Sequence, residues 1–298
     1  MKILIAGGSG FIGRYIEKHF HDQGHSVNIL TRKPKGKNDV LWDGKSLGSW
    51  KETLVDTDVL INLTGKSVDC RYTKSNKAEI LCSRLDSTAI HNEVLRSEKN
   101  KVKLFINASS ATIYDHSLER INTEKNGIIG DDFSMNVVKS WEEELFKNVD
   151  NIRRVAMRMS IVMGADGGAY PKIKMITKLG LGGHQGDGFQ KVSWIHIDDL
   201  MRAVHHIVQH QELAGPIYVT SPHPVTNRKL MSAIRKSQDI SFGICQPKWL
   251  LEVGSFFLRT ETELLLKSRN VYPQELVDSG FVFQYNTIDS CMTNLAIT

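Results

Sequence analysis

The feature that most constrains this chain is a glycine-rich turn, Gly7-Gly8-Ser9-Gly10-Phe11-Ile12-Gly13, directly after the apolar run 3–6. The run has no polar alternation, so it predicts a short strand buried on both faces. Apolar and aromatic side chains then follow one stripe of an amphipathic helix, at Phe11, Ile12, Tyr15, Ile16, His19 and Phe20. Gly24 ends that helix, and a second apolar run occupies 26–30. A strand, a glycine turn, a helix and a strand within about thirty residues predict a dinucleotide-binding βαβ unit.

Glycine suits this turn for two reasons. A tight turn needs backbone dihedral angles that other residues avoid, and a side chain would hold the backbone away from a pyrophosphate. The anion then binds to free N–H groups at the N-terminus of the helix. Glycines also mark ordinary turns, but their position between this strand and this helix indicates a dinucleotide site.

The end of the second strand carries basic residues. A unit that prefers NAD usually has a carboxylate here for the ribose 2′-hydroxyl, whereas this chain has Thr31-Arg32, followed by Lys33 and Lys35. A guanidinium suits a 2′-phosphate because the two groups form paired, charge-assisted hydrogen bonds. The strand end therefore favours NADP over NAD, with a solvated basic loop as the alternative.

Composition and charge limit the classes of partner. The 298 residues are 41% hydrophobic and 24% charged, and a dispersed net charge of +5 argues against nucleic-acid binding despite the basic run 32–37. No apolar segment approaches the ~18 residues of a membrane span, and the N-terminus enters a strand at once, so we expect no signal peptide. The four cysteines lack the spacing of a metal site or a disulfide framework, so we expect reduced thiols in a cytoplasmic protein.

One predicted helix carries three histidines with partial metal-ligand spacing, His205, His206 and His210. They have no acidic or cysteine companion, so we expect solvated or cap-adjacent histidines and no metal site. Asp198 and Asp199 come at the start of that helix, and we expect these aspartates to cap its N-terminus.

Strand-like and helix-like segments alternate along the rest of the chain, which is typical of an α/β protein with a Rossmann, doubly wound parallel sheet. The further elements that the pattern predicts are buried strands over 59–63, 104–108 and 155–162 and helices over 74–97 and 133–147. Hydroxyl side chains, among them Ser110 and Tyr114, follow the strand at 104–108. They are well placed for chemistry, or they could cap the following turn.

The last part of the chain has a different sequence pattern. The glycine-rich segment 179–188 predicts an irregular loop, plausible as a lid or substrate wall, and from about residue 246 the pattern becomes helical, with apolar residues between Trp249 and Leu266. We therefore expect a Rossmann domain over 1–240, with substrate-wall insertions from about 165, and a small helical subdomain over 241–298.

With these residues in view, the chain resembles the extended branch of the short-chain dehydrogenase/reductase superfamily. More narrowly, it is similar to the "epimerase family" members that resemble nucleotide-sugar epimerases. The resemblance covers nearly the whole chain and rests on the glycine turn, Thr31-Arg32, Asn62–Gly65, Ser83-Arg84, Trp141-Glu142, 179–190, Ser193–Asp199 and Ser279–Phe283. The segments 179–190 and 193–199 are specific to that subfamily, whereas the glycine turn alone indicates only the superfamily.

The resemblance implies which residues contact the cofactor. They are Gly7, Gly10, Phe11, Ile12 and Gly13 at the turn, Thr31 and Arg32 at the 2′-phosphate, and Asn62, Leu63 and Thr64 beside the adenosine or ribose. In similar proteins the helix after that strand also touches the cofactor. This adds Glu79 and Arg84, for which surface charge is the alternative interpretation.

The resemblance also implies catalytic residues, one of which is missing here. Extended-branch enzymes use a Ser or Thr just past the fifth strand, matched by Ser110, and a Tyr-x-x-x-Lys on the next helix, in which Lys139 matches. Met135 occupies the tyrosine position, and a thioether has no proton to exchange. We expect Met135 to face the nicotinamide, since one helical turn separates it from Lys139. The alternative is that Met135 simply packs against the cofactor or the helix, as flexible methionines often do. The literal Tyr-x-x-x-Lys at Tyr170–Lys174 follows the wrong strand, and we treat it as a coincidence.

Two functions therefore remain open. The leading one is an NADP-binding oxidoreductase or epimerase acting on a small carbonyl or hydroxyl substrate such as a nucleotide sugar, with Tyr114, Asp131 or Asp132 as the substitute acid/base. For Tyr114, a packing or cofactor-contact role is the alternative. The alternative, favoured by Met135, is an NADP-binding sensor or regulatory protein without turnover. The sequence does not indicate an oligomeric state.

Overall fold

The computed structural model describes residues 1–96, 99–147, 152–252 and 266–297. Its centre is a seven-stranded sheet with the strand order β10-β6-β5-β4-β1-β2-β3, and every neighbouring pair is parallel. The strands are β1 Lys2–Ala6, β2 Ser26–Thr31, β3 Asp39–Leu41, β4 Val59–Asn62, β5 Leu104–Ser110, β6 Arg153–Met159 and β10 Gly215–Val219. The order reverses at β1, from which the chain runs first to β2 and β3 and then to β4, so the predicted Rossmann fold is confirmed.

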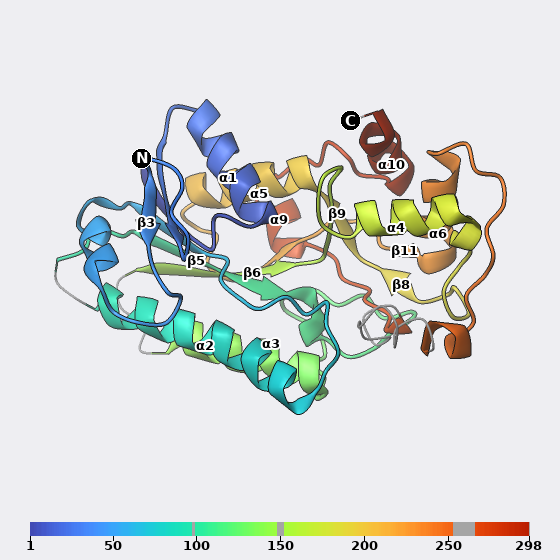
Figure 1. The fold of residues 1–298 in the computed structure, drawn as a ribbon, viewed down its shortest axis with the longest axis horizontal. Coiled ribbons are helices and arrows are strands. Elements are labelled where there is room, and N and C mark those ends of the chain that lie inside the picture. Colours follow the sequence, from blue (N-terminus) through green and yellow to red (C-terminus); the bar gives the residue numbers. More distant parts are fainter. Residues whose placement is uncertain (97–98, 148–151, 253–265, 298) are drawn as a thin grey trace.

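Helices cover both faces of the sheet (Figure 1). Helices α1 (Phe11–Asp22) and α5 (Ile197–Gln209) lie on one face, and α2 (Lys74–Leu95) and α3 (Phe133–Phe146) lie on the other. Alternate residues of each strand therefore enter different cores, which explains the unbroken apolar run in β1. In the described part of the chain, no helix is long and apolar enough to cross a membrane.

A third core lies beyond the carboxyl ends of the strands. It is formed by side chains that include Tyr170, Trp194, Leu230, Met231 and Met292. The elements in this region are β7 Ile161–Met163, α4 Tyr170–Ile176, η3 Thr177–Leu181, β8 Lys191–Val192, β9 Trp194–His196, β11 Val225–Thr226, α6 Asn227–Lys236 and α10 Ile288–Ile297. Other short helices are η1 Ser49–Asp56, η2 Ala111–Ile113 and α9 Gln274–Asp278.

The prediction of one continuous strand over 155–162 is wrong. The chain leaves the main sheet after Met159, and β7 pairs instead with β9, with Ile161 opposite Trp194. An apolar run cannot reveal such a change of partner, because both parts are buried strands.

The predicted aspartate caps of α5 are also wrong. The N-cap residue is His196, whose Nδ1 accepts the backbone N–H of Asp198 at 3.1 Å. Asp199 is fully buried, and its two carboxylate oxygens accept the backbone N–H groups of Gln284 and Tyr285, each at 2.8 Å. These backbone partners lie far along the chain, so local spacing could not identify them.

The described C-terminal part combines short helices with extended chain. Residues 248–252 are helical, and the apolar pattern predicted across 253–265 lies outside the described residues. Residues 270–272 run along the loop before α3. Asn122 donates its backbone N–H to the carbonyl oxygen of Asn270 at 2.8 Å, and Tyr272 donates to the carbonyl oxygen of Asn122 at 2.9 Å.

Candidate functional site

The candidate site lies at the carboxyl ends of the central strands. In β1, β2, β4 and β5 these ends meet at one edge of the sheet, where open parallel sheets bind ligands beside the strand at which the order reverses. A side chain that the protein's own atoms cover completely has no surface left for a ligand. Exposure therefore separates the predicted residues that can contact a ligand from those that shape the site.

The glycine turn has the geometry of a phosphate cradle. Gly7 has a φ of +73°, which L side chains rarely adopt, and a Cβ on Gly13 would lie 2.4 Å from the carbonyl oxygen of Gly8. Both glycines are therefore required by the protein's own packing. Gly10 differs, because a Cβ there would meet only the carbonyl oxygen of Gly7, at 3.4 Å. Since α1 has no side-chain N-cap, the first turn presents backbone N–H groups beside this space, which fits a pyrophosphate.

A second glycine-rich turn packs on the start of α1. A Cβ on Gly164 or Gly167 would lie 2.6 or 2.2 Å from ring atoms of Phe11. The hydroxyl of Tyr15 donates a hydrogen bond of 2.7 Å to Asp166 in the same turn. Phe11 is half-buried and anchors this turn, while part of its surface remains accessible.

The end of β2 brings hydroxyl and basic groups together. Thr31 is 8% exposed, and its Oγ1 donates to the Oγ of Ser9 at 3.5 Å and accepts the backbone N–H of Lys33 at 3.3 Å. Arg32 is exposed. Ser9, which sequence reasoning did not single out although it lies inside the turn, thus borders the predicted 2′-phosphate position.

Asn62, at the end of β4, shapes the site from inside the protein. It is fully buried, its Nδ2 donates to the Oδ1 of Asn107 at 2.8 Å, and its Oδ1 accepts the backbone N–H of Thr64 at 3.0 Å. The side chain therefore fixes the turn after β4 and has no surface for a cofactor. Leu63 and Thr64 are half-buried and remain accessible candidates.

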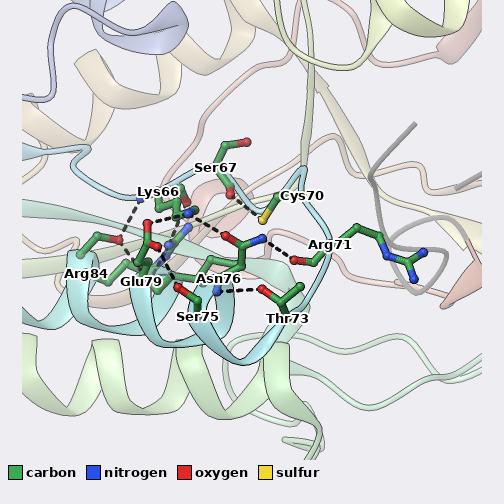
Figure 2. A network of polar contacts seen from close by, with 11 residues as sticks. Lys66, Ser67, Cys70, Arg71, Thr73, Ser75, Asn76, Glu79 and Arg84 are labelled. Atoms are coloured by element: carbon green, nitrogen blue, oxygen red, sulfur yellow. Dashed lines mark hydrogen bonds and ion pairs between the residues drawn. The ribbon is translucent and has the colours of Figure 1, made fainter. Parts of the chain in front are cut away.

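Glu79 and Arg84 belong to a polar network that holds the loop after β4 against α2 (Figure 2). Arg84 donates to the carbonyl oxygens of Lys66, at 3.1 Å, and Ile80, at 2.8 Å. Its guanidinium lies 5.0 Å from the ring of Trp141 on α3, and burial lowers its pKa to about 10. Lys66 in turn donates to Glu79 at 2.6 Å.

Through these contacts, Arg84 anchors the loop that leads from β4 to α2. Glu79 is exposed, and its contact with a cofactor stays a prediction.

Ser110 and Lys139 both keep accessible surface at this edge. The Oγ of Ser110 accepts hydrogen bonds from the backbone N–H of Thr112 at 3.2 Å and from its hydroxyl at 3.0 Å. Lys139 lies on α3, which packs against η2 directly after Ser110, and its Nζ pairs with Asp131 at 3.0 Å. That ammonium lowers the pKa of Asp131, whose side chain is 89% exposed.

Met135 does not face an open cleft, so the expectation that it faces the nicotinamide is wrong. It is 3% exposed, and its Sδ accepts the backbone N–H of Asp132 at 3.4 Å. A Cβ on Gly130 would lie 2.1 Å from the same sulfur. Helical spacing put residue 135 on the face of Lys139, but the loop before α3 folds back over it.

Asp131 pairs with Lys139, and the other two candidate substitutes for the missing tyrosine, Tyr114 and Asp132, are also held by contacts with neighbouring residues. Tyr114 is 2% exposed, its hydroxyl accepts from Arg158, and burial raises its pKa to about 12. Asp132 caps α3 by accepting the backbone N–H of Met135 at 2.9 Å and also pairs with Lys267. Burial acts to raise the pKa of Asp132, but these hydrogen bonds and charges lower it on balance.

The histidines of α5 and the literal Tyr-x-x-x-Lys make contacts of their own. Among the described residues, no group of three or more His, Cys, Asp or Glu side chains could hold a metal ion. His205 stacks on Phe20 with ring centroids 5.5 Å apart. Tyr170 is buried at the start of α4, and the Nζ of Lys174 lies 5.4 Å from the centre of its ring.

The family comparison matches most of the chain. The model of the NAD dependent epimerase/dehydratase family matches residues 3–220, and a model of a domain of unknown function, DUF1731, matches residues 246–295. The epimerase family protein YfhF of Bacillus subtilis is 32% identical and covers 99% of this chain and 98% of its own. The human epimerase family protein SDR39U1 is 26% identical and covers 99% of both chains.

Solved structures agree with this relationship. The crystal structure of human SDR39U1 (isoform 2) with NADPH matches with a TM-score of 0.89 at 27% identity, covering 100% of this chain and 99% of the other. The UDP-N-acetylglucosamine 4-epimerase from Bacillus cereus matches with a TM-score of 0.76 over 100% and 96% of the two chains. At 14% identity, the latter is a likeness of fold alone.

Proposed function

The chain belongs to the NAD dependent epimerase/dehydratase family, and we propose that it is an NADP-dependent oxidoreductase or epimerase. Its substrate is a small molecule with a carbonyl or hydroxyl group, such as a nucleotide sugar. The observation that carries the proposal is the space beside Gly10, which a Cβ would enter and which the N-terminus of α1 borders. The NADPH in the similar human structure supports the choice of cofactor.

The cofactor would lie along the carboxyl edge from β2 to β5. Gly10 leaves room for its pyrophosphate, while Gly7 and Gly13 allow the tight backbone path of the turn. Thr31 and Arg32 hold the 2′-phosphate with a hydroxyl and a guanidinium. NADP, when bound, supplies or accepts the hydride of the reaction.

At the substrate end, Ser110 and Lys139 act on the reacting oxygen. The Oγ of Ser110 accepts both hydrogen bonds from Thr112, so its own proton is left to donate to a substrate oxygen. Lys139 holds the nicotinamide ribose and places a positive charge beside that oxygen as negative charge develops on it. Its ammonium also serves as the proton donor, and the ion pair with Asp131 at 3.0 Å orients it.

Cofactor binding is tested first, by titrating the protein with NADPH and following the cofactor fluorescence. We expect saturable binding that Gly10→Val abolishes while circular dichroism shows the fold intact. A folded Gly10→Val variant that binds NADPH normally would place the site elsewhere.

Turnover is then tested by NADPH oxidation with small carbonyl compounds and by interconversion of nucleotide sugars. Ser110→Ala and Lys139→Met should each lower the rate by about a hundred-fold or more, as expected when a proton donor or an oxyanion donor is lost. Mass spectrometry of ligands that co-purify with the protein narrows the choice of substrate. Unchanged rates in both variants would contradict the assigned roles.

An NADP-binding sensor without turnover remains the second candidate. One observation favours it: the position of the usual tyrosine is a methionine that the protein covers almost completely, at 3% exposure. This candidate predicts tight NADPH binding without oxidation of the cofactor by any substrate class, together with a change in protease sensitivity when NADPH binds.

A further inference from the structure

A buried ion pair lies directly behind the proposed catalytic residues. Glu142 of α3 and Arg158 of β6 make a two-point contact, in which Nε of Arg158 donates to Oε1 at 2.8 Å and Nη2 donates to Oε2 at 2.6 Å. Their side chains are only 10% and 5% exposed. Paired geometry of this kind fixes both the distance and the orientation of the two groups.

The pair connects the elements that carry the site. The hydroxyl of Ser109 on β5 donates to Oε1 of Glu142 at 2.5 Å. Arg158 also donates to the hydroxyl of Tyr114, and its guanidinium lies 5.8 Å from the ring of Tyr218 on β10. Helix α3, the end of β5, β6 and β10 therefore meet at one charged contact.

Stability alone does not account for such a pair. Two charges lose their hydration when they are buried, and an apolar pair of similar size is often equally stable or more so. Geometry offers a better explanation. Ser109 is the neighbour of Ser110, and Glu142 lies one helical turn beyond Lys139. Ser110 is thus next to a residue that contacts the carboxylate of Glu142, and Lys139 lies on the same helix as Glu142.

We propose that Glu142 and Arg158 are positioning residues, which set α3 against β5 so that Lys139 and Ser110 converge on the nicotinamide end of the cofactor. The inference rests on the proposed NADP binding. Neither residue contacts the cofactor or substrate, because the protein's own atoms cover both. They act through Lys139 and Ser110.

The test separates the two ends of the cofactor. Adenosine 2′,5′-bisphosphate contains only the half that binds near Arg32, whereas NADPH also contains the nicotinamide half. In Glu142→Gln and in Arg158→Lys, affinity for the bisphosphate should stay as in the parent protein. Affinity for NADPH should fall by about five-fold or more, equivalent to about 1 kcal/mol.

Arg154 supplies a matched control on the same strand. It is 3% exposed, and it anchors the far end of α3 by donating to the carbonyl oxygen of Leu145 at 3.2 Å. Arg154→Lys removes buried guanidinium contacts without disturbing the carboxyl edge. It should lower thermal stability while leaving the ratio of the two affinities unchanged.

If Glu142→Gln fails to fold, the milder Ser109→Ala variant, together with Arg158→Lys, decides the question, because Ser109→Ala removes a single hydrogen bond to Glu142. If the ratio of the affinities for NADPH and the bisphosphate is unchanged in the folded variants, the pair has only a structural role. The same conclusion follows if Arg154→Lys changes that ratio equally. Absence of NADPH binding in the parent protein would instead defeat the proposed function, so the two failures are distinguishable.

Discussion

The sulfur of Met135 occupies the space that a side chain on Gly130 would need, with only 2.1 Å between that sulfur and the position of a Cβ. The same sulfur accepts the backbone N–H of Asp132, the residue that caps α3. Met135 is therefore part of the helix start, and its burial depends on the conformation of the loop before α3.

Met135→Tyr is accordingly not expected to create a reductase. A ring placed against Gly130 would overpack the helix start, at a cost of about 1–3 kcal/mol in unfolding free energy. Met135→Leu conserves volume and should cost less than about 1.5 kcal/mol. Urea unfolding compares the two variants. A Met135→Tyr variant that is as stable as the parent and oxidises NADPH faster would show that residue 135 can reach the nicotinamide.

Arg32 should determine the preference for NADP. We expect NADPH to bind at least about ten-fold more tightly than NADH, equivalent to about 1.4 kcal/mol. Arg32→Ala should remove most of that preference by weakening NADPH alone. Lys37→Ala, in the same exposed basic segment, provides the control for net charge. Equal affinities in the parent protein, or an unchanged preference in Arg32→Ala, would contradict the assignment.

Gly10 and Gly13 should respond differently to the smallest substitution. In Gly13→Ala the new methyl group would lie 2.4 Å from the backbone of Gly8, so we expect a large loss of thermal stability. In Gly10→Ala the methyl group enters the cradle, so the fold should persist while NADPH affinity falls. Thermal melts and NADPH titrations measure the two effects, and equal stability losses would remove the distinction between a packing glycine and a ligand glycine.

His91 should make the fold sensitive to acid. It is fully buried beside Trp42 and Trp50, and burial lowers its pKa from 6.5 to about 3. The unfolded state therefore binds the proton first. The free energy of unfolding keeps its full value above about pH 6.5. Below that pH it falls by about 1.4 kcal/mol for each pH unit, down to about pH 3.

Urea unfolding at pH 7.5 and pH 5 measures this dependence. His91→Leu should flatten it, although the variant itself will be less stable at neutral pH. The matched control is His21→Leu, on the exposed surface of α1, which should leave the pH dependence as in the parent. A dependence that is equally steep in His91→Leu would assign the acid sensitivity to other groups.

The sequence was most informative where the signal is local. The glycine turn, the apolar strands and the helix stripes depend on neighbours within a few residues, and they predicted the sheet and the position of the cradle. The resemblance matches Asn62 and Arg84 to cofactor contacts, yet Asn62 is fully buried and Arg84 donates to carbonyl oxygens of the loop after β4 and of its own helix. Sequence spacing locates a side chain near the edge but cannot determine whether it faces the ligand or the interior.

The features that the sequence did not predict depend on contacts between residues far apart in the chain. Glu142 was visible only as part of a family pattern, because its partner Arg158 lies on a different element and the apolar run around Arg158 indicates only a buried strand. The burial of Met135 was missed for the same reason. It depends on Gly130 and the loop before α3, whose path no periodicity describes.

Asp199 has a consequence for how the chain is made. Its buried carboxylate pairs with Arg202 on its own helix, but its two backbone partners are residues 284 and 285. During synthesis, α5 leaves the ribosome long before those N–H groups exist, and a buried carboxylate without them is costly. We therefore expect α5 to dock fully only after residue 285 has emerged, so a nascent chain stalled before that point should remain sensitive to protease even though most of its Rossmann sheet has been synthesised.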